Sequence, residues 1–579
     1  MILQSLAGYY QRMAEEGGTG IAPEGFEKKE ISFLIILNNN GGFVGLQDTR
    51  EGEGKKKSGR IVTVPKGVKK TSGIAANLLW DNPAYLFARP KPDPKKDLDK
   101  LIERAKEQQQ CFINVIRERF PEPIQDEGIL AVLLFLESSN YQALFAHSAW
   151  EEVEESGANL TFKLDTDSCL VCQRPAIIAS LTTGADTGRE TEGSQICLVT
   201  GEFDMPARLH TSIKGVWGAQ SSGANIVSFN LDAFRSFGKE QGLNAPVGKR
   251  AEFAYTTGLN MLLARGSRQR LQVGDASTVF WGERKSPLED VFADLFGEPA
   301  KENPGQLNAA VSSLYAAPRL GAPPLTEDYT PFYVLGLAPN AARVAVRFWQ
   351  AGTVAGTARH IMQHFDDCNI VHGPNQPAHL SLFRLLASTA LLSKSENIQP
   401  NLAGDFMKSI LNGTPYPQTL LASAIRRCRA ERLVSYPRAA LIKGILARNA
   451  RYHNKTEKEV CMSLDTTNDT PGYLLGRLFS VLEHAQECAS PGINATIRDR
   501  FYGAASSTPV AVFPHLMKLK NHHIGKLDNK GHAISLEKQI GEILSGMQDF
   551  PTHLSLQDQG RFAIGYYHQR QAFFTKKSN

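Results

Sequence analysis

The sequence has few cysteines, eight in 579 residues, and they are scattered along the chain. Such an arrangement does not form a disulfide framework, and a reducing cytoplasm is the expected location. The sequence also lacks a long apolar run. The longest run near the N-terminus, residues 31–37, is too short to cross a bilayer and is typical of a buried strand. We therefore expect no membrane partner.

Motifs of several common enzyme classes are also missing. There is no G-x-x-x-x-G-K-[ST] loop, and no G-x-G-x-x-G opens a helix after a strand. The small-residue segment 503–507 lacks the G-x-S-x-G elbow of a serine nucleophile. These absences argue against P-loop nucleotide hydrolysis and serine-dependent acyl transfer. The sequence therefore predicts a protein that is not an enzyme and needs no cofactor.

Two segments leave metal chemistry open as an alternative. His364, Asp366 and Asp367 are possible ligands of a metal-dependent nuclease, although the same residues also fit a solvated helix end. Cys169-x-x-Cys172 has a zinc-like spacing. A structural zinc ion needs four ligands, which Cys197 and His210 would complete; buried or loop thiols are the competing interpretation.

Basic residues are unevenly distributed. The net charge of +5 is small for this length, but lysine and arginine gather in the segments 50–70, 401–450 and 515–530. Phosphates neutralised by such clusters release counterions and give affinity that does not depend on base sequence. Each cluster alone also fits an ordinary solvated surface. Together they favour a nucleic-acid partner.

The sequence pattern predicts an α+β fold: a mixed α/β N-terminal region over 1–395, followed by an all-α helical bundle over 396–579. Strand-like segments at 33–38, 60–64, 225–230 and 278–281 lie in the first region, together with a long helix over 94–120. After residue 400 helical periodicity dominates. Asp405 is expected to cap a helix that Gly413 ends. Apolar stripes follow at helical spacing in three further segments: Leu421, Ile425 and Cys428; Leu441, Ile442, Ile445 and Leu446; Leu475, Leu478, Phe479, Leu482 and Ala485.

Several long blocks resemble one known family. They are VPKGVKKTSG (64–73), NLLWDN (77–82), LHTSIKGVWGAQSSGANIVSFN (209–230), YVLGLAPNAARVAVRFW (333–349), PGYLLGRLF (471–479), NATIRDRFYGAASSTPVAVFPHL (494–516) and LSLQDQGRFAIGYYHQRQAFFTKK (554–577). The sequence is similar over essentially its whole length to the large subunit of the type I-C CRISPR surveillance complex, or Cascade. These large subunits form a Csd/Cas8-type family.

The resemblance implies a non-catalytic subunit of an RNA-guided complex in antiviral defence. Its partners would be crRNA, double-stranded target DNA and the displaced single strand, Cas5-type and Cas7-type subunits, a small subunit and a helicase–nuclease. Such subunits recognise the protospacer-adjacent motif (PAM) in duplex DNA, promote R-loop formation and recruit the helicase–nuclease. Region 1–395 would then contain PAM recognition and docking to the crRNA 5′ end and the Cas5-type subunit. A general RNA-binding scaffold is the remaining alternative.

Candidate DNA-binding residues fall into three groups. The segment after residue 64 offers cations for phosphates and polar groups for base edges: Lys66, Lys69, Lys70, Thr71, Ser72, Asn77 and Asn82. A Gly-rich loop offers Gln220, Ser221 and Asn225, although the same loop also fits a tight hairpin turn. The helical region offers cations that would line a path for the displaced or target DNA strand: Arg426, Arg427, Arg429, Lys518 and Lys520.

The family resemblance also implies a separate small subunit, made by internal translation initiation within the same gene. Met462 lies just upstream of the helical segment that begins at Pro471 and is the candidate start. The competing interpretation is an ordinary loop methionine.

Overall fold

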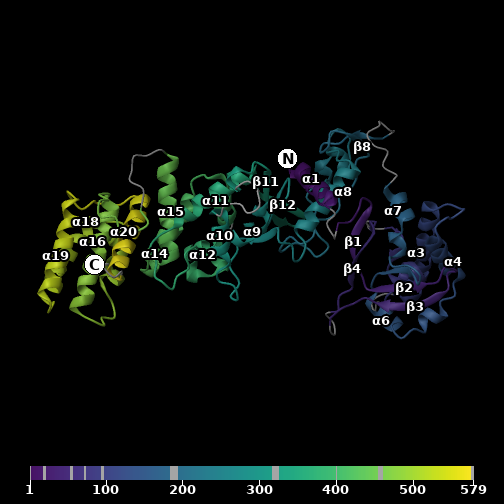
Figure 1. Cartoon of the computed structure of the whole chain (residues 1–579), viewed down its shortest axis with the longest axis horizontal. Helices are drawn as coiled ribbons and strands as arrows, with labels where there is room; N and C mark the ends of the chain where they lie inside the picture. Colours follow the sequence, from purple (N-terminus) through teal and green to yellow (C-terminus); the bar gives the residue numbers. More distant parts are fainter. Residues whose placement is uncertain are drawn as a thin grey trace. The chain divides into compact units, whose positions relative to one another are not determined.

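The computed structural model describes residues 2–16, 21–52, 57–68, 70, 73–92, 97–182, 193–315, 325–399, 401–453 and 461–574 (Figure 1). The chain divides into two compact units. Residues 3–211 with 228–258 form the first unit, and residues 212–227 with 259–579 form the second. Mixed sheets and helices come first and helices alone follow, which confirms the α+β class. The functional division expected at residue 395 stays a prediction.

The first unit contains a four-stranded mixed sheet. In spatial order its strands are β3 (Phe43–Asp48), β2 (Phe33–Leu37), β6 (Leu160–Leu164) and β5 (Trp80–Asp81). β2 and β6 are parallel, and the other two pairings are antiparallel. Alternate residues of β2 are buried, as the two-residue period of a strand requires. Two antiparallel pairs accompany this sheet: β1 (Phe26–Ile31) with β4 (Arg60–Pro65), and β7 (Gln195–Ile196) with β8 (Phe203–Asp204).

Helices cover this sheet and extend the unit. They are α1 (Ile2–Glu15), α2 (Pro83–Phe87), α3 (Leu98–Arg119), α4 (Glu127–Ser138), α5 (Gln142–Phe145), α6 (Trp150–Ser156), α7 (Pro175–Thr182) and α8 (Lys249–Leu262), the last turn of which belongs to the second unit. Phe112 and Ile116 of α3 and Phe135 of α4 share one hydrophobic cluster with Phe162 of β6. The side chain of Asp126 accepts a hydrogen bond from the Ile129 N–H and caps α4.

The second unit begins with an antiparallel sheet of four strands. Their spatial order is β12 (Arg343–Thr353), β11 (Pro331–Asn340), β10 (Ala276–Gly282) and β9 (Arg270–Val273). Every residue of β10 is buried. One hydrophobic cluster runs from Leu271 in this sheet to Tyr567 near the C-terminus. The sheet and the helices that follow it therefore share one core.

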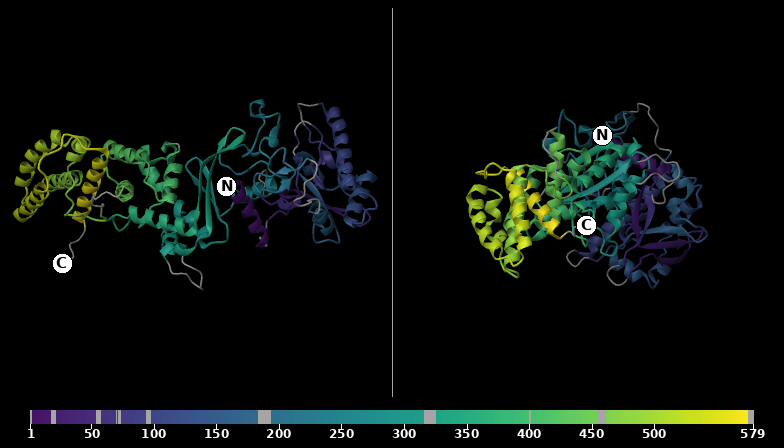
Figure 2. Two further views of the ribbon diagram at one scale, coloured as in Figure 1. Left: turned by 90° about the horizontal axis from the view of Figure 1, so that it is seen from above. Right: turned by 60° about the vertical axis from the view of Figure 1, so that its left-hand side comes forward.

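The second unit is otherwise helical. Its helices are α9 (Pro287–Phe296), α10 (Gln306–Tyr315), α11 (Val354–Cys368), α12 (Leu382–Thr389), α13 (Leu402–Asn412), α14 (Gln418–Glu431), α15 (Tyr436–Tyr452), α16 (Pro471–Ala489), α17 (Ile497–Ala505), α18 (Pro509–Gly525), α19 (Lys530–Ser545) and α20 (Leu556–Phe574). The last of these gather into a bundle, yellow in Figure 2. None of the described helices is long and apolar enough to cross a membrane.

Two glycines let α16 and α20 approach very closely. A Cβ atom added at Gly476 of α16 would lie 2.0 Å from the carbonyl oxygen of Phe562. One added at Gly565 of α20 would lie 2.2 Å from the carbonyl oxygen of Tyr473. Neither position can accept a side chain unless the backbones separate. We refer to Gly476 and Gly565 as the glycine seam.

The predicted apolar stripes of α14, α15 and α16 are confirmed, since all twelve of their residues are buried. Gly413 ends α13 at a φ of +68°, as expected. Asp405 does not cap that helix, which begins one turn earlier after Asn401, so Asp405 lies in its first turn.

Two other expectations were wrong in detail. The segment 225–230 is not a strand, because Asn225 makes only an isolated bridge to Arg343 and the following residues join no ladder. The described part of the helix expected over 94–120 begins at Leu98, after the capping residue Asp97. Leu98 is exposed, and the buried residues of α3 lie further along the helix.

Candidate nucleic-acid interface

The buried carboxylate of Asp81 organises the segment predicted to read DNA. Asp81 is 1% exposed and accepts backbone hydrogen bonds from Asn77 at 3.1 Å and Asn82 at 2.9 Å. The Lys70 ammonium lies 2.6 Å from its Oδ2 and 3.5 Å from the centre of the Tyr85 ring. A buried carboxylate needs such partners, because an unpaired buried charge is very costly. The segment therefore closes on itself around Asp81.

The predicted base-reading amides have partners within the protein. The Asn77 side-chain carbonyl accepts the Val68 N–H at 3.0 Å, and Asn77 is 5% exposed. The Asn82 side chain accepts the Ala84 N–H at 3.1 Å and caps α2. The geometry gives both residues a folding role, and their contact with DNA stays a prediction. Lys69, Thr71 and Ser72 lie outside the described residues.

Lys66 ties the same segment to helix α8. Its ammonium lies 2.9 Å from Oε2 of Glu252, and Oε1 of Glu252 accepts the Thr211 N–H at 2.6 Å. About a third of the Lys66 side chain remains exposed, so it still presents positive charge to solvent. Lys66 therefore combines a structural ion pair with partial access to a ligand.

A polar pocket of about 560 Å³ lies beside β4 in the first unit. Its cationic lining residues come from separate elements of the sequence: Lys28, Arg50, Arg60 and Lys163. Arg50 is neutralised by Asp48, at 2.7 Å, and by Glu152. The other three form no ion pair with any residue that the structure describes. The carboxylates of Asp48 and Glu51 also line the pocket. Three cations without an ion pair to a described residue, gathered around one hollow, suit phosphate, and no sequence pattern could have joined Lys28 to Lys163.

The predicted loop of the second unit is a closed hairpin with an exposed tip. Ile213 and Ala224 exchange two backbone hydrogen bonds, and Gly223 turns the chain at a φ of +89°. This geometry requires glycine, since a Cβ there would lie 2.8 Å from the Ile213 carbonyl oxygen. Gln220 and Ser221 are exposed at the tip. The loop is thus a tight turn that also presents polar side chains.

Asn225 lies at the base of this hairpin and holds it to β12. Its backbone N–H donates to the Ala342 carbonyl at 3.2 Å, and its carbonyl accepts the Val344 N–H at 2.9 Å. Its side chain is half-buried, with Oδ1 3.5 Å from the Ser212 hydroxyl. Asn225 is therefore less available to a base than Gln220 or Ser221.

Sequence reasoning missed Trp217, which lies beside the hairpin tip and is 63% exposed. Its backbone N–H donates to the Ser277 hydroxyl at 2.9 Å, which fixes the main chain while the indole stays in solvent. Exposed aromatic rings provide stacking surfaces for nucleic-acid bases. The signal available in the sequence was a tryptophan next to a Gly-rich turn.

The helical cations are mostly on the solvent side, as expected. Arg426 and Arg429 of α14 and Lys518 of α18 are exposed. Arg427 pairs with Glu431 on its own helix at 3.7 Å, and Lys520 pairs with Glu537 at 3.6 Å. The exposed members can reach phosphate, whereas the paired ones would first have to break an intramolecular contact.

The four residues of the proposed zinc set are not brought together. In the described part of the chain, no three of Cys169, Cys172, Cys197 and His210 place ligand atoms within 4.8 Å of one another. Burial raises the pKa of the Cys172 thiol to about 12. His210 Nδ1 pairs with the Tyr255 hydroxyl at 2.5 Å. The arrangement fits the alternative of separate thiols.

The proposed nuclease residues point to different partners. His364 is buried and pairs through Nδ1 with the Tyr416 hydroxyl at 2.6 Å, and burial lowers its pKa to about 3. Asp367 is buried and paired with two arginines, while Asp366 is exposed and accepts the Tyr315 hydroxyl at 3.0 Å. These three residues form no metal-binding group among the residues described. Their geometry is that of a packed helix end.

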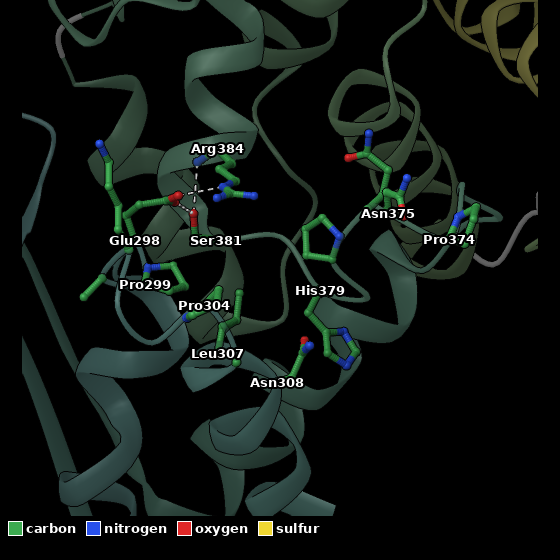
Figure 3. Close-up of a pocket in the computed structure, with 15 residues that line it drawn as sticks. Glu298, Pro299, Pro304, Leu307, Asn308, Pro374, Asn375, His379, Ser381 and Arg384 are labelled. Carbon is green, nitrogen blue, oxygen red and sulfur yellow. Dashed lines mark hydrogen bonds and ion pairs between the residues drawn. The ribbon is translucent and has the colours of Figure 1, made fainter.

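A second pocket, of about 630 Å³, lies in the second unit between the segment that joins α9 to α10, the start of α10, and residues 374–384 at and before the start of α12 (Figure 3). On one side the Glu298 carboxylate accepts hydrogen bonds from the Ser381 hydroxyl and from Arg384 Nε, at 2.6 Å for the latter. Ser381 also caps α12. His379 and Asn308 lie on the other side (Figure 3). Glu298 is neutralised and Ser381 is a helix cap, so the pair does not offer an activated nucleophile with a free base.

The comparisons with known proteins agree with the sequence blocks quoted above. The family model of the CRISPR-associated protein (Cas_Csd1) matches residues 6–574. No curated protein matches the sequence significantly. The matched range includes the Asp81 segment, the hairpin with Trp217 and the C-terminal bundle. The chain therefore belongs to the Cas_Csd1 family of CRISPR-associated proteins.

Proposed function

We propose that this protein is the non-catalytic large subunit of a type I-C Cascade. It recognises the PAM in double-stranded DNA, promotes R-loop formation and recruits the helicase–nuclease. The observation that carries the proposal is the family match over nearly the whole chain. Its place of action is the cytoplasm, and its partners are crRNA, the Cas5-type and Cas7-type subunits, the small subunit and target DNA.

The surface features support a division between gripping the backbone and reading bases. Lys28, Arg60 and Lys163 line a polar hollow and suit phosphate contacts. The tip formed by Trp217, Gln220 and Ser221 offers a ring and hydrogen-bonding groups on a main chain that is fixed by Gly223. A rigid turn with an exposed ring is suited to probing or separating a base step. We assign PAM contact to this tip in preference to the buried Asn77.

The first test is reconstitution. The protein is co-expressed with crRNA and the Cas5-type and Cas7-type subunits, and the purified complex is presented with duplexes that differ only in the adjacent motif. Binding that depends on the motif supports the proposal. A stable complex that binds every duplex equally would instead favour the general RNA-binding scaffold.

A second test addresses the tip. Trp217→Ala should weaken binding to a duplex containing the motif by about 5- to 160-fold, the range of one base–aromatic stack. Binding to a single-stranded target should hardly change, because no duplex has to be opened. Tyr329→Ala is the matched control, since Tyr329 is an aromatic residue of the same unit and 72% exposed. Equal losses on both substrates, or in both variants, would contradict the assignment.

A further inference from the structure

Three potential metal ligands meet in the C-terminal bundle, at a place that the proposed function does not use. They are His484 and Cys488 of α16 and His532 of α19. One ligand atom of each lies within 4.8 Å of the others, and this is the one such group among the described residues. All three side chains are partly buried.

The geometry of the pair on α16 suits a tetrahedral ion. His484 and Cys488 are four residues apart, so they lie on one face of the helix. The Cys488 sulfur is 3.6 Å from Nε2 of His484. Zinc bonds of about 2.0 Å to nitrogen and 2.3 Å to sulfur place those two atoms about 3.5 Å apart at a tetrahedral angle. The observed separation therefore needs almost no adjustment.

The surroundings orient the histidines. The His484 ring stacks on Phe573 of α20, with centroids 4.1 Å apart. Its Nδ1 lies 3.9 Å from the Glu487 carboxylate, so a metal on Nε2 leaves the other nitrogen facing a carboxylate. Carboxylates in that position fix the tautomer of histidines that bind metal. The His532 backbone is held in the first turn of α19 by the cap Asn529.

We propose that His484, Cys488 and His532 bind a borderline-soft divalent transition metal, of which Zn²⁺ is the natural occupant, and that the ion fastens α16 to α19. Two imidazoles and a thiolate select such an ion over Mg²⁺ or Ca²⁺, which prefer oxygen ligands. Water completes the coordination, while Glu487 faces the other ring nitrogen of His484. The sequence contained half of the signal, the H-x-x-x-C spacing on a helix, but the third ligand depends on the packing of α19.

The test uses the full chain purified without a histidine tag, stripped with a chelator and titrated with Co²⁺. We expect one ion per chain, tetrahedral visible bands and a thiolate-to-cobalt charge-transfer band. Zn²⁺ should displace the Co²⁺ and raise the melting temperature, whereas Mg²⁺ should not. Cys488→Ser should abolish the charge-transfer band, and His532→Asn should weaken binding by about 100-fold or more. Glu487→Gln should weaken it by about 10- to 100-fold.

Matched controls separate this site from adventitious binding. Cys461→Ser removes an exposed thiol outside the cluster, and His553→Asn removes an exposed histidine. Neither should change the spectrum or the affinity. The proposal is overturned if the stripped wild type shows no charge-transfer band after Co²⁺ is added, if the band survives in Cys488→Ser, or if the control variants lose it. Circular dichroism of each stripped variant shows that it is folded, so a lost band reports on the site.

Discussion

The buried ion pair between Asp367 and Arg448 leads to a prediction that distinguishes a structural role of Asp367 from a role in a nuclease site. Asp367 of α11 accepts Arg448 Nε at 3.1 Å and Arg451 Nη2 at 2.7 Å. The side chains of Asp367 and Arg448 are 2% and 1% exposed, whereas Arg451 is partly in solvent. Removing Asp367 would leave the buried Arg448 guanidinium without a counterion among the described residues, hydrogen-bonded to the carbonyl groups of Ser409 and Thr414 and 4.4 Å from the centre of the Tyr416 ring.

We expect Asp367→Ala to lower the free energy of unfolding by about 3–5 kcal/mol, the usual cost of breaking one half of a buried ion pair. Asp366→Ala is the matched control on the adjacent residue. Asp366 is exposed, and its replacement removes the hydrogen bond from Tyr315 and a charge interaction with His379, so we expect a loss of about 1 kcal/mol. Chemical denaturation of the full chain, followed by circular dichroism of the helices, measures both.

Two further measurements complete this test. The double variant Asp367→Leu, Arg448→Met should have a higher free energy of unfolding than Asp367→Ala, because an apolar pair of similar volume needs no counterion. Equal losses in Asp367→Ala and Asp366→Ala would refute the reasoning. Labelled DNA incubated with Mg²⁺ or Mn²⁺ tests the nuclease alternative: cleavage by the wild type that the folded Asp366→Ala variant lacks would favour an enzyme.

Three other predictions follow from the structure. Burial, with Arg448 and His379 nearby, lowers the pKa of His364 to about 3. Between about pH 6.5 and 3 the unfolded chain therefore binds a proton at His364 that the folded chain does not. The free energy of unfolding should fall as the pH drops through this range, and it should fall less steeply in His364→Gln. Gly476→Ala should lower the melting temperature far more than substitution of Gly503, where an added Cβ meets no atom within 4 Å. Replacing Arg426 and Arg429 with alanine should reduce the slope of log affinity against log salt by about 1.4 for single-stranded DNA, whereas Arg427→Ala, whose side chain already pairs with Glu431, should change it less.

The helical half could be predicted well from the sequence because its signal is local. Leu421, Ile425 and Cys428 recur at helical spacing, and their burial follows from that spacing alone. The candidate site was harder, because side-chain availability depends on partners that are distant in sequence. Asn77 looks like a base reader in the sequence, but the fold directs its amide to Val68 and its backbone to Asp81. His532 likewise joins His484 only through the packing of two helices.

The glycine seam has a consequence for the small subunit that the sequence predicts within this gene. A product beginning near Met462 would contain both Gly476 and Gly565, so α16 and α20 could pair in it as they do here. In the full chain, however, a Cβ at Gly560 of α20 would lie 3.3 Å from Ile442 of α15 and 3.5 Å from Leu421 of α14. The shorter product would lack α14 and α15, which precede Met462. One gene would thus encode the same bundle twice. In the full chain α14 and α15 cover this face of α20, whereas in the shorter product the same apolar face would need a surface of another chain to cover it.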